Sequence, residues 1–291
     1  MFQHRRTHNR RIRLAVVGAA GLALAAGLAA TATAAPGDRH GTAGPAAAKP
    51  TVVLVHGAWA DSAGWNGVIK RLQADGYPVA APANPLRGVA SDSAYLKDYL
   101  KTIHGPVVLV GHSYGGSVIT NAATGNPEVK ALVYIAAFAP DKGESLGSIS
   151  ARFPGSHLSD DPAAPVPTAL DAVPFTQPDG GTGVDLYIKP DKYRDVFLSN
   201  RLNRAAAAQL AAGQRPIAAQ AFGEPSGTPA WKTIPSWYLV ATADHAIPPA
   251  AERFMASRAH ARTVEVNAPH AAPLTDAGAV TRLVEQAATA R

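Results

Sequence analysis

Apolar residues along the chain alternate between short continuous runs and longer amphipathic stretches. The runs are rich in β-branched residues, which favour strands, and they lie at 51–55, 78–81, 106–110, 130–136, 235–241 and 262–266. The amphipathic stretches predict helices at 62–75, 91–103, 114–124, 249–259 and 276–290. This alternation is typical of a mostly parallel sheet covered by helices on both faces. The pattern therefore predicts an α/β protein with about six strands.

The stretch from about 141 to 231 breaks the alternation. It is rich in proline, and only 191–199 and 203–212 have helical patterns. A connection of about ninety residues is far longer than ordinary loops in a compact domain. We therefore expect a cap over the sheet, inserted after the fourth predicted strand.

The N-terminus has the pattern of an export signal. Five arginines between Arg5 and Arg13 precede an apolar run from Leu14 to Ala30, and Ala32-Thr33-Ala34 then matches a signal-peptidase site. We expect a signal peptide at 1–34, a flexible mature N-terminus at 35–50, a folded domain at 51–291, and secretion by either the Sec or the twin-arginine route. An uncleaved membrane anchor is the alternative, although Ala and Gly make the run weakly hydrophobic.

Charge and cysteine content exclude several classes. The formal charge of +6 falls to about +1 once the five arginines of the leader are removed, and no basic stripe remains, so we expect no nucleic-acid partner. The chain has no Cys, which excludes disulfides, thiolate catalysis and Cys-ligated zinc. We expect no metal site, no cofactor and no stable membrane span after cleavage.

The segment Gly111-His112-Ser113-Tyr114-Gly115-Gly116 follows a predicted strand and opens a predicted helix. Strand, sharp turn and helix are the context of a nucleophile elbow, in which glycines at 111 and 115 leave room for close backbone contacts. Ser113 is the candidate nucleophile. The alternative is a glycine-rich loop whose serine only caps the helix.

A serine hydroxyl needs a base, and in such elbow proteins the acid and then the histidine follow the serine along the chain. Asp244 lies at the carboxyl end of the strand at 235–241, and His270 follows the last predicted strand. Asp141, also after a strand end, is the competing acid. His245 and His260 are expected on the surface.

The remaining site predictions concern the oxyanion and the substrate. The backbone N–H groups of Tyr114 and Ala58 are the expected oxyanion donors, with His56 orienting the loop that contains Ala58. Trp59, Phe138 and Trp231 are expected at the substrate. Further aromatic residues of the cap could line the pocket or pack the cap onto the sheet: Phe153, Phe175, Tyr187, Tyr193, Phe197 and Phe222.

Together these motifs resemble those of α/β-hydrolase fold esterases, in a bacterial branch related to the plant methylesterase and hydroxynitrile lyase group. The resemblance extends over most of 51–290 and rests on His56-Gly57-Ala58-Trp59, 111–116, Ala230-Trp231-Lys232, Pro235-Ser236-Trp237-Tyr238, Asp244, Ile247-Pro248-Pro249 and His270. It implies a carboxylester hydrolase without metal or organic cofactor, with Asp244 as the acid. Gly57 and Ala271 stand where the lyases of the group have Thr and Lys, so cyanohydrin cleavage is disfavoured.

These observations predict an exported serine carboxylesterase that hydrolyses small or medium esters through an acyl-enzyme on Ser113. A cofactor-free haloperoxidase or perhydrolase, or a lactone or amide hydrolase, would use the same triad. A small-molecule sensor on the same fold is the alternative from another class. Neither the natural substrate nor the oligomeric state follows from the sequence.

Overall fold

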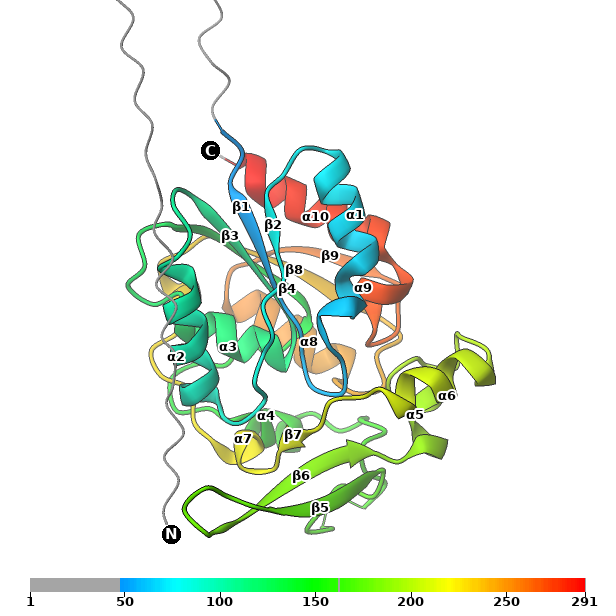
Figure 1. Ribbon diagram of the computed structural model, residues 1–291. Helices are drawn as coiled ribbons and strands as arrows, with labels where there is room; N and C mark the ends of the chain where they lie inside the picture. Colours follow the sequence, from blue (N-terminus) through cyan, green and yellow to red (C-terminus); the bar gives the residue numbers. More distant parts are fainter. Residues whose placement is uncertain (1–47, 162, 291) are drawn as a thin grey trace, which may run out of the picture. The chain divides into compact units, whose positions relative to one another are not determined.

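A computed structural model describes residues 48–161 and 163–290, so the signal-peptide prediction lies outside the described residues. The central sheet has six strands in the order β2-β1-β3-β4-β8-β9, and every neighbouring pair is parallel (Figure 1). The strands are β1 (Thr51–Val55), β2 (Val79–Ala80), β3 (Val107–Ser113), β4 (Val129–Ala137), β8 (Ser236–Ala241) and β9 (Arg262–Val266). The predicted sheet is confirmed.

Successive residues of the central strands serve two separate cores. In β1, Val52 and Leu54 belong to one buried cluster, whereas Val53 and Val55 belong to the other. Side chains in a strand point alternately to opposite faces, so a continuous apolar run is needed where both faces are covered.

Helices cover both faces of the sheet. One core contains side chains of α1 (Asn66–Ala74), which follows the short 3-10 helix Ser62–Trp65, and of α10 (Ala277–Thr289), which follows α9 (Ala272–Thr275). The other contains side chains of α2 (Val89–Leu100), α3 (Tyr114–Ala122) and α8 (Pro249–Arg258). Figure 1 shows these two groups on opposite sides of the strands.

Between β4 and β8 the chain forms the cap. It contains a three-stranded antiparallel sheet in the order β5-β6-β7, drawn below the main sheet in Figure 1. Its elements are α4 (Leu146–Arg152), β5 (Leu170–Thr176), β6 (Thr182–Ile188), α5 (Pro190–Val196), α6 (Arg204–Ala212), β7 (Ile217–Ala218), α7 (Gln220–Gly223) and the 3-10 helix Ala230–Lys232.

The cap sheet was absent from the sequence prediction. Most side chains of β5 are exposed, and Pro174 lies inside that strand. An exposed edge strand with a proline has no continuous apolar run to mark it. Within the described ranges, none of the helices combines the length and apolar character needed to cross a bilayer.

Candidate active site

The turn between β3 and α3 holds Ser113 in a strained backbone conformation. Its φ is 54° and its ψ is −127°, a region that costs free energy for a residue with a side chain. The neighbouring glycines have no room for a Cβ: one on Gly111 would lie 2.6 Å from the Gly115 oxygen, and one on Gly115 would lie 2.5 Å from the Val55 oxygen. The segment is therefore a strand-turn-helix elbow.

Ser113, His270 and Asp244 form one hydrogen-bonded chain. The Ser113 hydroxyl lies 2.9 Å from His270 Nε2, and His270 Nδ1 lies 2.6 Å from Asp244 Oδ2. All three residues are at most 3% exposed. The short bond to the carboxylate assigns the proton to Nδ1, which leaves Nε2 free to accept the serine proton.

The loop after β8 holds the Asp244 carboxylate from its other side. Asp244 Oδ1 accepts hydrogen bonds from the backbone N–H groups of Ala246, at 2.7 Å, and Ile247, at 2.9 Å. These bonds fix the carboxylate that orients His270.

A second acid, Glu252 of α8, lies behind Asp244 and is completely buried. Its Oε2 accepts the Ala241 N–H at 3.0 Å, whereas Oε1 has no partner among the described residues. Burial, and then the neighbouring Asp244, raise the pKa of Glu252 well above its usual range. Burial therefore favours the neutral form of Glu252, because an uncharged carboxyl oxygen without a partner costs less free energy than a charged one.

The expected oxyanion donors meet no acceptor in the described part of the chain. Neither the Ala58 N–H nor the Tyr114 N–H donates to a backbone or side-chain acceptor there. The loop that contains Ala58 passes directly over the nucleophile, since a Cβ on Gly57 would lie 2.5 Å from the Ser113 Cβ. Two free amides beside a nucleophile are suited to stabilising an oxyanion.

Two buried histidines hold the backbone around the site. His56 accepts the Asn84 N–H at Nε2, at 3.0 Å, so its Nδ1 donates to the Gly57 oxygen, at 2.9 Å. His112 Nε2 lies 2.8 Å from the His270 backbone oxygen. Burial lowers the pKa of His56 and lowers the pKa of His112 far more, so both are neutral and act as fixed hydrogen-bonding groups.

Trp59 separates two cavities. The cavity that contains Ser113 and His270 is only about 20 Å³ and is also lined by Phe138, whereas a mainly apolar cavity of about 220 Å³ lies on the other side of Trp59. Trp59 is held by the cap, because its indole N–H donates to the Leu186 oxygen at 2.9 Å. The smaller cavity has room for about one water molecule.

Trp231 and Asp141 lie away from Ser113. Both line a different cavity, and the Trp231 indole donates to the Pro140 oxygen at 3.0 Å. The structure therefore places Trp231 outside the cavity that contains Ser113, and its contact with substrate stays a prediction. Asp141 pairs with Lys232 at 2.6 Å instead of His270.

The cap aromatics divide between the cavities and packing. Phe222 lines the cavity at Ser113, and Tyr193 and Phe197 line the larger one. The ring of Phe153 packs against that of Phe254, and Phe175 lies beside the Arg87 guanidinium.

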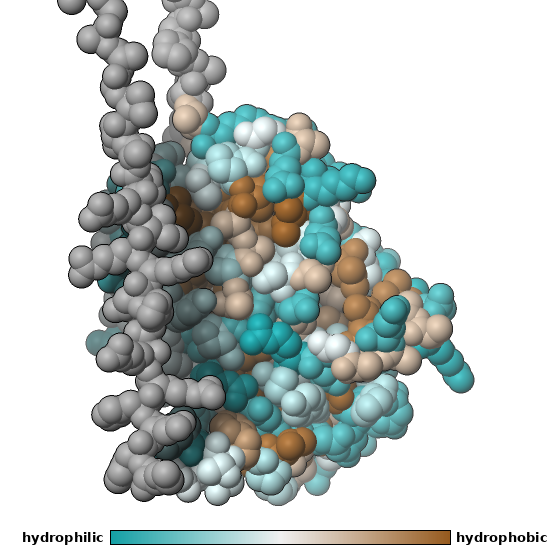
Figure 2. All heavy atoms as spheres, in the orientation of Figure 1, coloured by the Kyte–Doolittle hydropathy of each residue, from teal (hydrophilic) through white to brown (hydrophobic). Residues whose placement is uncertain are grey.

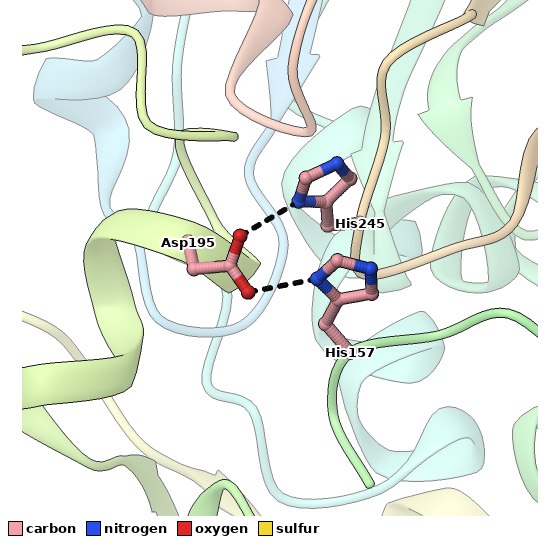
Figure 3. A group of neighbouring side chains, drawn as sticks. All are labelled: His157, Asp195 and His245. Atoms are coloured by element: carbon pink, nitrogen blue, oxygen red, sulfur yellow. Dashed lines mark hydrogen bonds and ion pairs between the residues drawn. The ribbon is translucent and has the colours of Figure 1, made fainter. Parts of the chain in front are cut away.

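A second group of His and Asp side chains includes His245, the residue that directly follows Asp244 in the sequence. His157 Nδ1 lies 2.7 Å from Asp195 Oδ2, and His245 Nδ1 lies 3.0 Å from Asp195 Oδ1 (Figure 3). In the described part of the chain, this is the one group whose donors could hold a metal ion. His245 is half-buried and not fully on the surface as expected, whereas His260 is exposed.

The sequence prediction missed His112, Glu252 and the pair of His157 with Asp195. His112 had a signal, since it is a polar residue inside an apolar strand that leads directly to Ser113. Glu252 had none, because an acid in the first turn of a helix is normally a solvated residue.

Known proteins similar to this chain include an esterase and a hydrolase. The carbendazim hydrolyzing esterase of Nocardioides sp. (strain SG-4G) is 35% identical over 107 residues, which are 32% of this chain and 44% of that protein. The pyrethroid hydrolase of Sphingobium wenxiniae is 29% identical over 223 residues, 70% of this chain and 74% of that protein. This chain thus spans under half of the first relative.

The crystal structure of polyneuridine aldehyde esterase has the same fold, with a TM-score of 0.68 at 18% identity over 82% of this chain and 98% of that one. The profile of the Alpha/beta hydrolase family matches residues 52–283. That match covers most of the chain and both ends of the triad, and the protein therefore belongs to the Alpha/beta hydrolase family.

Proposed function

We propose that this hydrolase is an exported serine carboxylesterase. The single observation that supports the serine mechanism best is the continuous chain of hydrogen bonds from Ser113 through His270 to Asp244, with lengths of 2.9 Å and 2.6 Å. The similarity to a carbendazim hydrolyzing esterase and to a pyrethroid hydrolase supports an ester as the substrate.

In this proposal, Ser113 Oγ attacks the ester carbonyl while its proton passes to His270 Nε2. The carbonyl oxygen becomes an anion and accepts the N–H groups of Ala58 and Tyr114. The C–O bond of the ester then breaks, and the alcohol leaves with the proton from His270. Water attacks the acyl-enzyme by the same steps in reverse order, which releases the acid and restores Ser113.

The substrate is expected to be an ester with at least one small, apolar part. Apolar side chains dominate the lining of the Ser113 cavity, and no Lys or Arg is among its lining residues in the described part of the chain. Gly57 and Ala271 do not provide the Thr and Lys of the lyases that the sequence resembles, which argues against cyanohydrin cleavage.

The proposal is tested by hydrolysis of p-nitrophenyl esters of increasing acyl length, with Ser113→Ala as the matched control. We expect turnover by the native protein, loss of turnover in Ser113→Ala, and labelling of Ser113 by a fluorophosphonate. A protein that binds these esters but hydrolyses none of them, with Ser113 unlabelled, would contradict the esterase and favour the sensor.

Export is tested separately, by N-terminal sequencing of the protein found outside cells of a producing host. The arginine-rich start and the small residues at 32–34 support cleavage after Ala34. We expect a mature chain that begins at Ala35. An intact chain that stays with the membrane fraction would favour the anchor instead.

A further inference from the structure

The three side chains of Figure 3 come from three separate segments of the fold. His157 lies in the loop after α4, Asp195 lies in α5, and His245 directly follows Asp244 in the loop after β8. A backbone hydrogen bond of 2.7 Å from the His157 N–H to the His245 oxygen already joins two of these segments. The group therefore links the cap to the loop that carries the proposed catalytic acid.

The geometry of this group brings three metal-ligand atoms together. One donor atom from each residue lies within 4.8 Å of the other two, and both imidazoles direct Nδ1 toward the same carboxylate. The two rings lie nearly face to face, with centroids 4.0 Å apart and planes inclined by 31°. Two imidazolium cations at that distance would repel, whereas one ion between two neutral imidazoles and a carboxylate satisfies all three groups.

We propose that His157, Asp195 and His245 form a binding site for one divalent transition-metal ion of the Zn²⁺, Ni²⁺ or Co²⁺ type. Two imidazole nitrogens favour these ions over Mg²⁺ or Ca²⁺, which prefer oxygen ligands. With bonds of about 2.0–2.2 Å, tetrahedral ligand atoms lie roughly 3.4 Å apart, so the present N to O distances of 2.7 Å and 3.0 Å widen by about half an ångström.

The surroundings allow this adjustment. The side chains of His157, Asp195 and His245 are 45%, 38% and 30% exposed, so the ion can enter from solvent and water can complete its coordination. Asp195 Oδ1 also accepts a hydrogen bond of 3.0 Å from Asn200, which holds the carboxylate in place.

Metal binding would affect the cavity at Ser113 through the residues that follow the metal ligands in the sequence. Leu158 follows His157, Ala246 follows His245, and both line the cavity of about 20 Å³ that contains Ser113. An ester is too large for that cavity, so the cap must move for substrate to enter. An ion that ties these two segments together opposes that movement, and this effect on turnover rests on the proposed esterase function.

The direct test is titration of the untagged protein with ZnCl₂ by calorimetry, and with CoCl₂ followed by visible absorption. We expect one ion per chain, a tetrahedral Co²⁺ spectrum, and an affinity that falls by roughly tenfold or more in Asp195→Asn and in His157→Gln. His260→Gln, which removes an exposed histidine outside the group, should bind as tightly as the native protein. Thermal unfolding of each variant checks that it is folded.

The proposed site would be overturned if the native protein bound no metal ion. Equal affinity in the native protein, in both ligand variants and in His260→Gln would overturn it as well. A separate measurement follows p-nitrophenyl butyrate hydrolysis with Zn²⁺ or with a chelator. Zn²⁺ should slow the native protein and leave Asp195→Asn unaffected. If Ser113 fails to react with any ester, the calorimetry and the Co²⁺ spectrum still decide the metal site, so failure of one proposal is distinguishable from failure of the other.

Discussion

Two histidine and aspartate networks start from adjacent residues in this protein and have opposite surroundings. Asp244 pairs with His270 at 2.6 Å, and both side chains are completely buried. Asp195 pairs with His157 and with the neighbour of Asp244, His245, at 2.7 Å and 3.0 Å, and all three side chains are exposed by 30% to 45%.

The same two residue types therefore lie in surroundings that differ mainly in burial, and this difference underlies the two roles proposed for them. Around Asp244 the surroundings are buried, and two backbone N–H groups fix the orientation of the carboxylate. Around Asp195, solvent screens the pair and leaves room for an ion. The buried network is suited to moving a proton, and the exposed network is suited to binding and release.

The largest expected effect comes from Asp244→Asn. Without the carboxylate, the tautomer and orientation of His270 are lost, and kcat/KM for a p-nitrophenyl ester should fall by about three to four orders of magnitude. Steady-state kinetics measures this, and Asp141→Asn is the matched control, since Asp141 pairs with Lys232. A similar loss in Asp141→Asn would show that the acid has been assigned wrongly.

The second largest expected effect is a loss of folding stability at acidic pH, and its source is the buried side chain of His112. The pKa of His112 is well below the ordinary imidazole value of about 6.5, because burial and then His270 disfavour its charge. As the pH falls, the unfolded chain takes up this proton at a higher pH than the folded chain does. The contribution of His112 to the free energy of unfolding is therefore fully present above pH 6.5 and decreases below it by about 1.4 kcal/mol per pH unit.

Urea unfolding at pH 8 and pH 5 measures this loss. In His112→Gln the difference between the two pH values should shrink, since Gln has an N–H donor for the His270 oxygen but does not titrate. His56, whose pKa is also lowered by burial, accounts for part of what remains. An unchanged difference in His112→Gln would contradict the assignment.

Glu252 provides a third test, because the exposed network has no equivalent acid. Glu252→Leu leaves the Ala241 N–H without an acceptor and should lower the free energy of unfolding by about 1–3 kcal/mol, and kcat with it. Glu252→Gln should retain most stability and activity at pH 7, because a neutral amide reproduces a neutral acid. Equal losses of stability and activity in Glu252→Leu and Glu252→Gln would mean that Glu252 is ionised in the folded protein.

Trp59 shields the buried network from the larger cavity, and Trp59→Leu should weaken that barrier. We expect the ratio of kcat/KM for octanoate over acetate esters to rise by about tenfold, as the acyl chain gains access to the cavity of about 220 Å³. Trp231→Phe is the control, because Trp231 lines a different cavity. A ratio unchanged in Trp59→Leu would show that substrate does not extend in that direction.

The smallest expected effect is that of Asp195→Asn on stability without metal. Exposed ion pairs contribute little, so the free energy of unfolding should change by less than about 1 kcal/mol in a chelator buffer. Calorimetric unfolding checks this. A decrease of several kcal/mol in the free energy of unfolding would mean that the exposed group stabilises the fold as strongly as a buried one. The two networks would then not differ in the way described above.

Figure 2 shows why exposure is hard to infer from composition. On that face, polar side chains surround small groups of apolar ones, which lie at the upper centre, at the right and near the bottom of the view. Leu274 of α9, which lines the larger cavity, is 41% exposed. An apolar residue at a helical position therefore does not reveal whether it packs in a core or borders an opening.

The central sheet and the positions from which the candidate site is built could be predicted from the amino-acid sequence. Continuous apolar runs are unambiguous where both faces of a strand are buried, and the turn after β3 requires glycines that leave a local signature around Ser113. His270 and Asp244 were identifiable because each follows one of those strands, where open α/β sheets place their functional residues.

What lies around those positions became visible only in the folded protein. The cap sheet, the pairing of Trp231 with Pro140, the acid behind Asp244 and the group of His157, Asp195 and His245 depend on contacts between segments far apart in the chain. Burial of a polar side chain depends on its neighbours in space, and a local pattern indicates it for His112 inside an apolar strand but not for Glu252. For that reason His245 and Asp244, adjacent in the sequence, belong to networks with different chemistry.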